Sequence, residues 1–587
     1  MMQQQTTVMN DGPMNAERLL AHYEKIADAP DAIARLRRFI LDLAVRGKLV
    51  PQDASDEPAS ELLKRIAKEK ARLVKAGKVR KPPTLEPIRE AEALYALPRT
   101  WAWVRVGDIF DYDAGTKRDP RELDQSRWLL ELEDIEKDTS RIVERLRVSD
   151  RDSRSTKSEF EPGDILYGKL RPYLNKVVIA HEPGYSTTEI VAIRPFLRLC
   201  PEYCALAFRR PDFVAYVERL GRGTKMPRLR TPDAIVAPFP LPPLAEQHRI
   251  VAKVDELMGL CDRLEAARAG REAVRDKLTA ASLARLNAPD AETFQADARF
   301  ALDALPALTT RPDQIKVLRQ TILNLAVRGK LVEQNANDEP ISATLHRAMA
   351  RRAALVKAKK VRAKKLDGFV DLKADAALPS SWVLERLGNL VDPENTISYG
   401  VLVPGEEVRD GIPFVRAQDL ALSGHPERPN KTIAPEIEKA YARTRLRGGE
   451  ILVCVVGSIG KLGIVPPSWA GANIARAVAR ILPIPEISRE YLLVVLRGEP
   501  VQTYFNETTR TLAQPTLNVG LIEQTPIPLP PLAEQHRVVA KVDALMALCD
   551  RLEASLAATA TTRRRLLDAL LAEALAPADD RELEAAE

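Results

Sequence analysis

A cluster of cationic side chains lies between residues 219 and 230, where the sequence reads RLGRGTKMPRLR and contains no acid. The five cations are Arg219, Arg222, Lys225, Arg228 and Arg230. Guanidinium and ammonium groups bind phosphate oxygens, and arginine can also donate two parallel hydrogen bonds to a guanine base. Because glycine and proline predict a loop, the segment could follow a phosphate chain or enter a nucleic-acid groove. We predict that the last four cations contact nucleic acid; a solvated charged loop is the alternative.

The second half of the chain has a counterpart to this loop, NETTRTLAQPTLN (506–518), in which Pro515 aligns with Pro227. Arg510 and Gln514 are its candidate contacts, because arginine can read guanine and glutamine can read adenine. The position is therefore duplicated while its side chains differ. This is the pattern expected if two copies of one device recognise two different sequences.

Three shorter stretches carry similar side chains: YGKLRPYLNK (167–176), FVRAQDL (414–420) and GSIGK (457–461). Their candidate contacts are Lys169, Arg171, Tyr173, Asn175, Lys176, Arg416, Gln418, Ser458 and Lys461. For each one, a plain surface or framework contact is the alternative. The run KEKARLVKAGKVRKPP (68–83) instead predicts a solvated helix face, with a position against DNA or a partner enzyme as the alternative.

The sequence lacks the motifs of a self-sufficient enzyme. It contains no GxxxxGK[ST] phosphate loop, no GxGxxG and no DPPY-type or NPPF-type stretch of an adenine methyltransferase. Its six histidines have no metal-ligand spacing, and its five cysteines form no CxxC pair, so reduced, buried thiols are expected. We therefore predict no catalytic residue, no metal site and no bound cofactor.

Two long segments of the chain are nearly identical. Residues 241–266 (LPPLAEQHRIVAKVDELMGLCDRLEA) differ from residues 529–554 only at Ile250/Val538, Glu256/Ala544 and Gly259/Ala547. Each copy follows two prolines and repeats apolar residues at spacings of four and three, which predicts a long helix with a heptad seam. The segments at 36–66 and 318–348 form a second repeated pair, with apolar stripes that predict helices ending at Gly47 and Gly329.

The repeats divide the chain into alternating conserved and variable blocks. We predict an N-terminal helical half-module (1–96), a first variable domain (97–240), a central helical region (241–377), a second variable domain (378–528) and a C-terminal helix (529–587). The variable blocks contain short β-branched runs bounded by glycine and proline, with helices between them, which predicts two α/β domains with a shared framework.

The helical repeats also predict how the blocks connect. Neither long helix has an evident seam partner except the other, which predicts an antiparallel coiled-coil or helical bundle joining the two α/β domains. The N-terminal helices would pack on the C-terminal long helix, just as residues 318–370 would pack behind the first long helix. The expected arrangement is pseudo-two-fold and circular.

Several of these segments together carry a family resemblance. They are the duplicated LPPLAEQHR helix start, AVRGKLVPQDASDEPASELLKRI, KLRPYLNKVVIA, STTEIVAIRP and YARTRLRGGEILVCVVGSIGKLGIVPPSWAGANIARAVARI. They resemble the specificity (S) subunit of type I restriction–modification systems, over nearly the whole chain from Ala32 to Ala574.

The resemblance implies the following function. Two target-recognition domains each read one half of a bipartite, asymmetric double-stranded DNA site. The helices set the spacer and dock two modification (methyltransferase) subunits, and restriction (translocase and endonuclease) subunits join the complex. S-adenosylmethionine, ATP and Mg are then expected on the partner subunits.

Two other functional classes remain open from the sequence. One is a coiled-coil scaffold without sequence-specific DNA binding, and the other is a self-sufficient DNA enzyme. The net charge of +6 over 587 residues permits a nucleic-acid partner without requiring one. No signal peptide or membrane-spanning apolar run is present, so a cytoplasmic location is expected.

Overall fold

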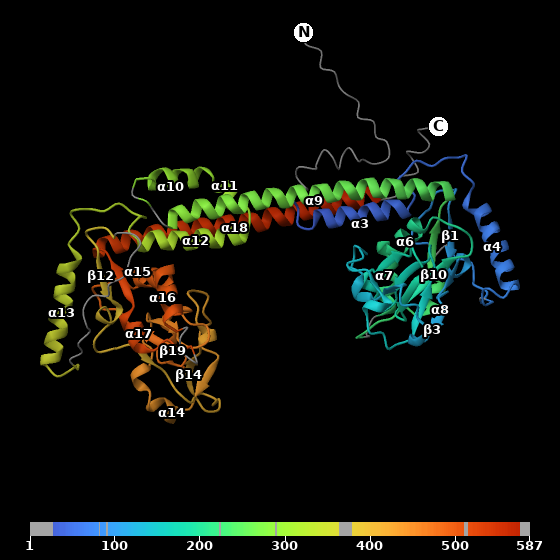
Figure 1. The fold of residues 1–587 in the computed structure, drawn as a ribbon. Coiled ribbons are helices and arrows are strands. Elements are labelled where there is room, and N and C mark those ends of the chain that lie inside the picture. The colour runs from blue at the N-terminus through green and yellow to red at the C-terminus, as the bar shows by residue number, and fades with distance from the viewer. Residues whose placement is uncertain are drawn as a thin grey trace, which may run out of the picture. The chain divides into compact units, whose positions relative to one another are not determined.

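A computed structural model describes residues 28–81, 83–89, 92–221, 225–287, 290, 292–362, 378–509 and 515–575. The chain forms two compact units: unit 1 comprises the described residues up to Gly270 and from Ala560 on, and unit 2 comprises those from Arg271 to Thr559. Two helices of 44 residues, α9 (Leu244–Asn287) and α18 (Leu532–Leu575), pass from one unit into the other in opposite chain directions (Figure 1). The fold thus consists of two α/β regions joined by long antiparallel helices.

The α/β region of unit 1 contains eleven strands among the described residues. They are β1 (Ala102–Arg105), β2 (Phe110–Tyr112), β3 (Lys117–Arg118), β4 (Trp128–Leu130), β5 (Leu146–Arg147), β6 (Lys157–Phe160), β7 (Ile165–Gly168), β8 (Val177–Ile179), β9 (Gly184–Thr187), β10 (Ile190–Pro195) and β11 (Pro238–Leu241). They form a two-stranded sheet β1-β11, a four-stranded sheet β2-β10-β7-β8 and a five-stranded sheet β3-β6-β9-β4-β5. The accompanying helices are α5 (Val106–Ile109), α6 (Pro201–Arg209), α7 (Pro211–Leu220) and α8 (Thr231–Ile235), with 3-10 turns η2 (Pro120–Glu122), η3 (Leu132–Asp134), η4 (Val148–Asp150) and η5 (Pro172–Leu174).

The four-stranded sheet of unit 1 is buried on both faces. Successive side chains of a strand point to opposite faces, and β10 follows this rule. Val191 and Ile193 join the core that contains α6 and α7, whereas Ile190 and Ala192 join a second apolar core with Trp128. Burial on both sides explains the continuous apolar run of this strand.

Unit 2 repeats this plan with fewer strands. They are β12 (Val383–Arg386), β13 (Ser398–Tyr399), β14 (Ile412–Val415), β15 (Lys431–Ile433), β16 (Ile451–Cys454), β17 (Leu462–Ile464), β18 (Asn473–Ile474), β19 (Val478–Ile481) and β20 (Pro526–Leu529), paired as β12-β20, β13-β19-β16-β17 and β15-β14-β18. The helices are α14 (Pro435–Lys439), α15 (Arg489–Arg497), α16 (Glu499–Thr509) and α17 (Val519–Gln524), with η6 (Leu387–Asn389), η7 (Ala417–Asp419), η8 (Ala442–Thr444) and η9 (Pro467–Trp469). Because β16 pairs with β17 and β19 in the order in which β7 pairs with β8 and β10, equivalent positions can be read from the register.

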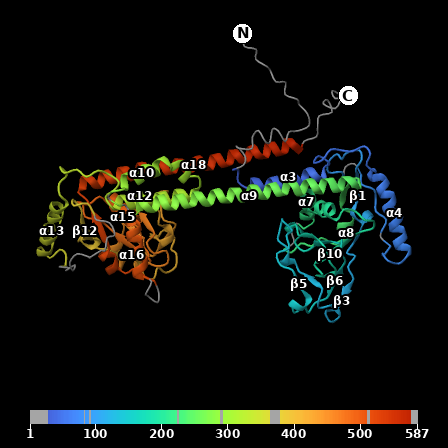
Figure 2. The same cartoon turned by 45° about the horizontal axis from the view of Figure 1, so that its top comes forward.

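Six shorter helices remain among the described residues, and some of them lie along the long helices (Figure 2). They are α3 (Ala32–Val45) and α4 (Ala59–Lys75) in unit 1, and α10 (Phe294–Asp303), α11 (Leu305–Leu308), α12 (Pro312–Val327) and α13 (Ile341–Lys357) in unit 2. Gly47 and Gly329 follow α3 and α12 with φ of 69° and 66°, which confirms their predicted role at the helix ends.

The heptad seams of α9 and α18 correct one prediction. They do not share a core with each other. Ile250 and Val254 of α9 lie in one core with Ile40 of α3, and Arg37 of α3 binds Asp262 of α9 at 2.5 Å. The seam of α18 shares a different core with α12, where Arg319 binds Asp550 at 2.7 Å. The short amphipathic helices cover the seams because they reach them within the same unit.

The predicted packing of each short helix behind a long helix is confirmed. Arg35 of α3 forms an ion pair with Asp568 in the last turns of α18, and Ala32 lies in one apolar cluster with Leu567. In unit 2, Arg311 at the start of α12 binds Glu272 of α9 at 2.9 Å. The first described helix therefore meets the last one within unit 1, which agrees with a circular path of the chain.

The repeated AEQHR segment fastens each α/β region to its long helix. In unit 1 the Glu246 carboxylate accepts hydrogen bonds from Trp101 (2.9 Å) and Gln52 (2.6 Å), and the Gln247 side chain accepts one from the Cys200 amide at 3.1 Å. Unit 2 makes the same contacts from Glu534 to Trp382 and Gln334, and from Gln535 to Ser488. Burial raises the pKa of Glu246 and of Glu534, and the donated hydrogen bonds oppose that rise. The same buried hydrogen bonds in both units thus explain why the AEQHR segment is repeated, without any catalytic role.

All five cysteines are buried and unpaired, as predicted. Among the residues that the structure describes, no helix is both long enough and apolar enough to cross a membrane.

Candidate nucleic-acid interface

Unit 1 brings two of the predicted segments together. The Arg171 amide donates to the Pro227 carbonyl at 2.8 Å, and the Leu229 amide donates to the Lys169 carbonyl at 3.0 Å. An isolated bridge pairs Leu170 with Arg228. The turn after β7 and the basic loop before α8 therefore form one surface, although about fifty residues of sequence separate them. We call residues 169–173 together with 225–230 the paired loops.

The cations of the paired loops differ in how far their charges are engaged. Arg171, Tyr173 and Lys225 are exposed, and neither Arg171 nor Lys225 has an ion-pair partner among the described residues. The backbone at Arg171 lies in the left-handed region with φ of 49°. A free, exposed guanidinium on a tight turn is suited to contact phosphate or a base edge.

Two arginines of the paired loops have acidic neighbours. Arg228 binds Glu189 at 3.0 Å, and its side chain is 50% exposed. The hydrogen bond that Arg228 donates to Glu189, together with the Glu189 charge, holds the pKa of Arg228 above the ordinary value. Arg230 binds Asp233 at 2.8 Å. Exposed pairs of this kind contribute little stability, so DNA could displace either acid at small cost. Arg222 lies outside the described residues.

Asn175 and Lys176 point into the framework instead. The Asn175 side-chain amide donates to the Arg209 carbonyl at 3.3 Å, and Lys176 Nζ donates to the Leu132 carbonyl at 2.6 Å. Burial lowers the pKa of Lys176. Lys461 makes the equivalent contact in unit 2, with 3.2 Å from Nζ to the Ala417 and Gln418 carbonyls. This repeated contact favours the framework interpretation for both lysines.

In unit 2 the equivalent main-chain frame carries other side chains. The Leu517 amide donates to the Val455 carbonyl at 2.9 Å, and Val456 forms a bridge with Thr516. A cavity of about 510 Å³ lies beside this turn. It is lined by Gly457, Ser458, Ile459, Thr503, Asn506, Glu507, Thr509 and Pro515. Ser458 was predicted, whereas the polar groups of α16 were not; Arg510 and Gln514 lie outside the described residues.

Arg416 and Gln418 lie at η7. Arg416 binds Asp419 through two nitrogens at 3.0 and 3.1 Å, which raises the pKa of Arg416. Gln418 is exposed. The Arg416 charge is therefore engaged within its own turn, where its Nη1 and Nη2 also donate to the Gln418 side-chain oxygen at 3.2 and 2.8 Å.

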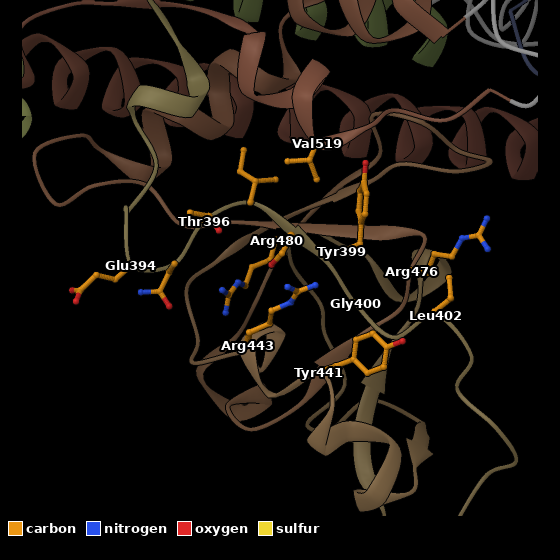
Figure 3. Close-up of a pocket in the computed structure, with 13 residues that line it drawn as sticks. Glu394, Thr396, Tyr399, Gly400, Leu402, Tyr441, Arg443, Arg476, Arg480 and Val519 are labelled. Atoms are coloured by element: carbon orange, nitrogen blue, oxygen red, sulfur yellow. The ribbon is translucent and has the colours of Figure 1, made fainter. Parts of the chain in front are cut away.

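A second cavity in unit 2 contains arginines that the sequence analysis missed (Figure 3). Its lining includes Arg443, Arg476 and Arg480 together with Tyr399 and Tyr441. These residues come from β13, η8, β19 and the turn between β18 and β19, which lie far apart in the sequence.

Comparison with known proteins places the chain in a family. Residues 393–561 match the model of the type I restriction modification DNA specificity domain. The EcoEI specificity subunit of the type I restriction enzyme from Escherichia coli is 31% identical over 92% of this chain and 94% of its own length. The EcoAI specificity subunit, also from Escherichia coli, is 31% identical over 92% of this chain and 93% of its own.

One solved structure agrees at the level of fold. A chain from a study of complex assembly and conformational transition of the type I R-M system aligns with a TM-score of 0.50 and 23% identity, over 82% of this chain and 99% of that one. The HsdS subunit from Thermoanaerobacter tengcongensis aligns with a TM-score of 0.43 and 23% identity, over 83% of this chain and 99% of its own. Because the EcoEI and EcoAI relatives span nearly the full length of the chain, it belongs to the family of type I restriction enzyme specificity subunits.

Proposed function

We propose that the two α/β regions are target-recognition domains, residues 97–240 and 378–528, each of which reads one half of a bipartite, asymmetric DNA site. The observation that carries this proposal is one main-chain frame with two sets of side chains. Arg171 is the third residue after β7, and Gly457 is the third residue after β16. A shared frame with different side chains is suited to read two different base sequences in one manner.

The candidate DNA contacts differ between the two domains. In the first domain they are Lys169, Arg171, Tyr173, Lys225, Arg228 and Arg230, with Arg222 as a further candidate. In the second they are Ser458, Gln418 and Arg416, with Arg510 and Gln514 as further candidates. Asn175, Lys176 and Lys461 take the role of holding these loops in place. Phosphate contacts would position each domain, and arginine or amide contacts with base edges would supply specificity.

The repeated helices are proposed to dock two modification subunits. His248, Asp255 and Arg263 of α9 are exposed, as are their equivalents His536, Asp543 and Arg551 of α18. The spacing places each set on the helix face opposite the seam. Buried contacts explain why the seam residues are the same in both helices, but they do not explain why these exposed residues are the same. Two copies of one partner would explain it.

Catalysis is proposed to belong to the partners. S-adenosylmethionine would bind to the modification subunits, and ATP and Mg to restriction subunits. Double-stranded DNA is the shared substrate of this assembly, and the specificity subunit determines which DNA sequence the assembly binds. No finding supports the scaffold alternative, which a salt-dependent DNA-binding measurement on the complex would test directly.

A domain exchange tests the proposal. Residues 97–240 are replaced by the equivalent domain of the EcoEI specificity subunit, and the methylated sites of the host genome are mapped. Only one half of the methylated sequence should change, because the other domain and both long helices are retained. The reciprocal exchange of residues 378–528 is the matched control and should change only the other half. If either exchange alters both halves, the two domains do not read independently.

A further inference from the structure

The arginine-lined cavity of unit 2 is recessed and has an excess of positive charge. Its volume is about 510 Å³, and Glu394 is its only acidic lining residue. Arg443 and Arg476 are exposed, and neither has a side-chain hydrogen bond or ion pair with any described residue. In Figure 3 the Arg443 and Arg480 side chains extend toward the same part of the cavity, while Arg476 extends away from them.

Arg480 differs from the other two because it is only 3% exposed. Its Nη1 donates to the Arg445 carbonyl at 3.0 Å, and its buried Nε has no partner among the described residues. Desolvation lowers the pKa of Arg480, yet an arginine in a protein stays protonated. The nearby Glu450 carboxylate is engaged by the amides of Arg447 and Gly448. A buried guanidinium with an unused donor is costly unless an anion completes it.

The corresponding position in unit 1 holds no charge. Arg480 on β19 pairs with Leu452 of β16, and the equivalent pair in unit 1 joins Ala192 of β10 to Leu166 of β7. Ala192 is fully buried in an apolar core. The two domains therefore share the strand and its register but not this side chain. In unit 1 the arginine of this strand is Arg194, which binds Asp164 at 2.6 Å, whereas Arg480 forms no ion pair with any described residue. The guanidinium charge on this strand is therefore held differently in the two domains.

We propose that this cavity binds a phosphodiester group of the DNA that the second domain contacts, an assignment that rests on the proposed function. DNA phosphates project from the duplex, whereas base edges lie on the floor of a groove. A recessed site therefore suits a projecting phosphate, while reading a base requires a side chain that projects from the protein. Arg443 contacts the phosphate oxygens from the rim, and the buried Arg480 guanidinium adds its positive charge from below. The Tyr441 hydroxyl adds a further donor.

The test uses the assembled methyltransferase complex with the Arg443→Gln variant. Arg443 is exposed and without a partner, so its replacement should leave folding unchanged. Arg409→Gln is the matched control, since Arg409 is exposed in the same domain and does not line the cavity. The Arg443 variant should bind the cognate duplex and a duplex with a scrambled second half-site more weakly by the same factor, about tenfold. The slope of log affinity against log salt should fall by about 0.9, and the methylated sequence should stay the same.

Two further arms sharpen the test. Methylphosphonate linkages, which are uncharged, are placed one at a time across the second half-site of the duplex. At one position, the methylphosphonate should weaken DNA binding by the wild-type complex but should not weaken DNA binding by the Arg443→Gln complex any further. Arg480→Gln should behave like Arg443→Gln, with folding verified by thermal unfolding, and Arg480→Lys should recover part of the affinity.

Four outcomes would overturn the assignment. The first is equal DNA affinity of Arg443→Gln and Arg409→Gln, and the second is a methylated sequence that is relaxed at one base. The third is that the effect of every methylphosphonate adds to the effect of Arg443→Gln. The fourth is that, when inorganic phosphate or AMP is titrated in place of DNA, the variant binds only these free anions more weakly. The third outcome means that the cavity touches no phosphate of the duplex, and the last means that it holds a free anion. If the wild-type complex itself shows no sequence-specific binding, the proposed function fails, independently of this cavity.

Discussion

Arg228 and Arg171 lie on the two sides of one main-chain bridge, but their charges are held differently. Arg228 forms an ion pair with Glu189 at 3.0 Å, whereas Arg171 has no acidic partner among the described residues. An arginine whose guanidinium is oriented by a carboxylate is better placed for directional contact with a base. A free arginine on an exposed turn is better suited to follow the phosphate chain.

We therefore expect Arg228→Ala to weaken specific DNA binding by about 1–3 kcal/mol and to relax only the first half-site. The measurement is affinity for duplexes altered at each position of that half-site, together with mapping of methylated sites. Arg219→Ala serves as the control, because Arg219 is an exposed arginine of α7 just before this loop and is not among the candidate contacts. Equal weakening of binding to every sequence would identify Arg228 as a phosphate contact. No effect on binding would favour the alternative that this loop is a solvated surface without a DNA contact.

At the scale of the element, each long helix has a buried seam face and an exposed face on the opposite side. The seam face of α9 packs against α3, and that of α18 packs against α12. On the opposite face, the exposed residues His248, Asp255 and Arg263 of α9 recur in α18 as His536, Asp543 and Arg551. Two identical partner subunits would each need the same exposed helix face to bind to.

We expect the double variant His248→Glu and Arg263→Glu to bind one modification subunit instead of two, because only one copy of the face is altered. The same pair of changes at His536 and Arg551 should remove the other subunit, and the combined variant should bind none. Native mass spectrometry measures the stoichiometry. Glu256→Ala is the matched control, since the second copy already has alanine at that position. Retention of two subunits by every variant would exclude this face as the docking surface.

At the scale of the whole molecule, the two units are connected twice. Both α9 and α18 pass between them, and each contains 44 residues, about 66 Å at 1.5 Å per residue. If these helices set the distance between two readers, both must change length together. An insertion in one helix alone would strain the other connection.

We expect a four-residue helical insertion after Gly270 of α9 together with one after Thr559 of α18 to lengthen each helix by about 6 Å. At about 3.4 Å per base pair, the unspecified spacer of the methylated site should grow by one or two base pairs. Both half-site sequences should remain as they were. Sequencing of methylated sites reports the spacer, and the single insertion in α9 should instead lower the stability of the fold. An unchanged spacer would show that the helices do not set the distance.

Several features of this protein could be predicted from local pattern alone. Apolar spacing of four and three predicted the long helices, two prolines predicted where each starts, and the glycines after α3 and α12 predicted their ends. The duplication predicted two similar α/β regions and the packing of the short helices on the long ones. These predictions succeeded because each depends on residues close in sequence, or on a motif of many residues that occurs twice.

Other features depended on residues that only folding brings together. The partner of each heptad seam was predicted incorrectly, because a seam records that a helix is covered but not which helix covers it. The paired loops arise from a bridge between Leu170 and Arg228, and the arginine cavity assembles side chains from β13, η8, β19 and the turn between β18 and β19.

The sequence by itself therefore determined the family, the repeated helices and the two-domain plan, because these follow from periodicity and duplication along the chain. Only the tertiary structure decided which cations are exposed, which are engaged by acids such as Glu189 and Asp419, and which are buried. That division depends on distances between side chains far apart in sequence, and a charge's availability is set by its nearest neighbours in space.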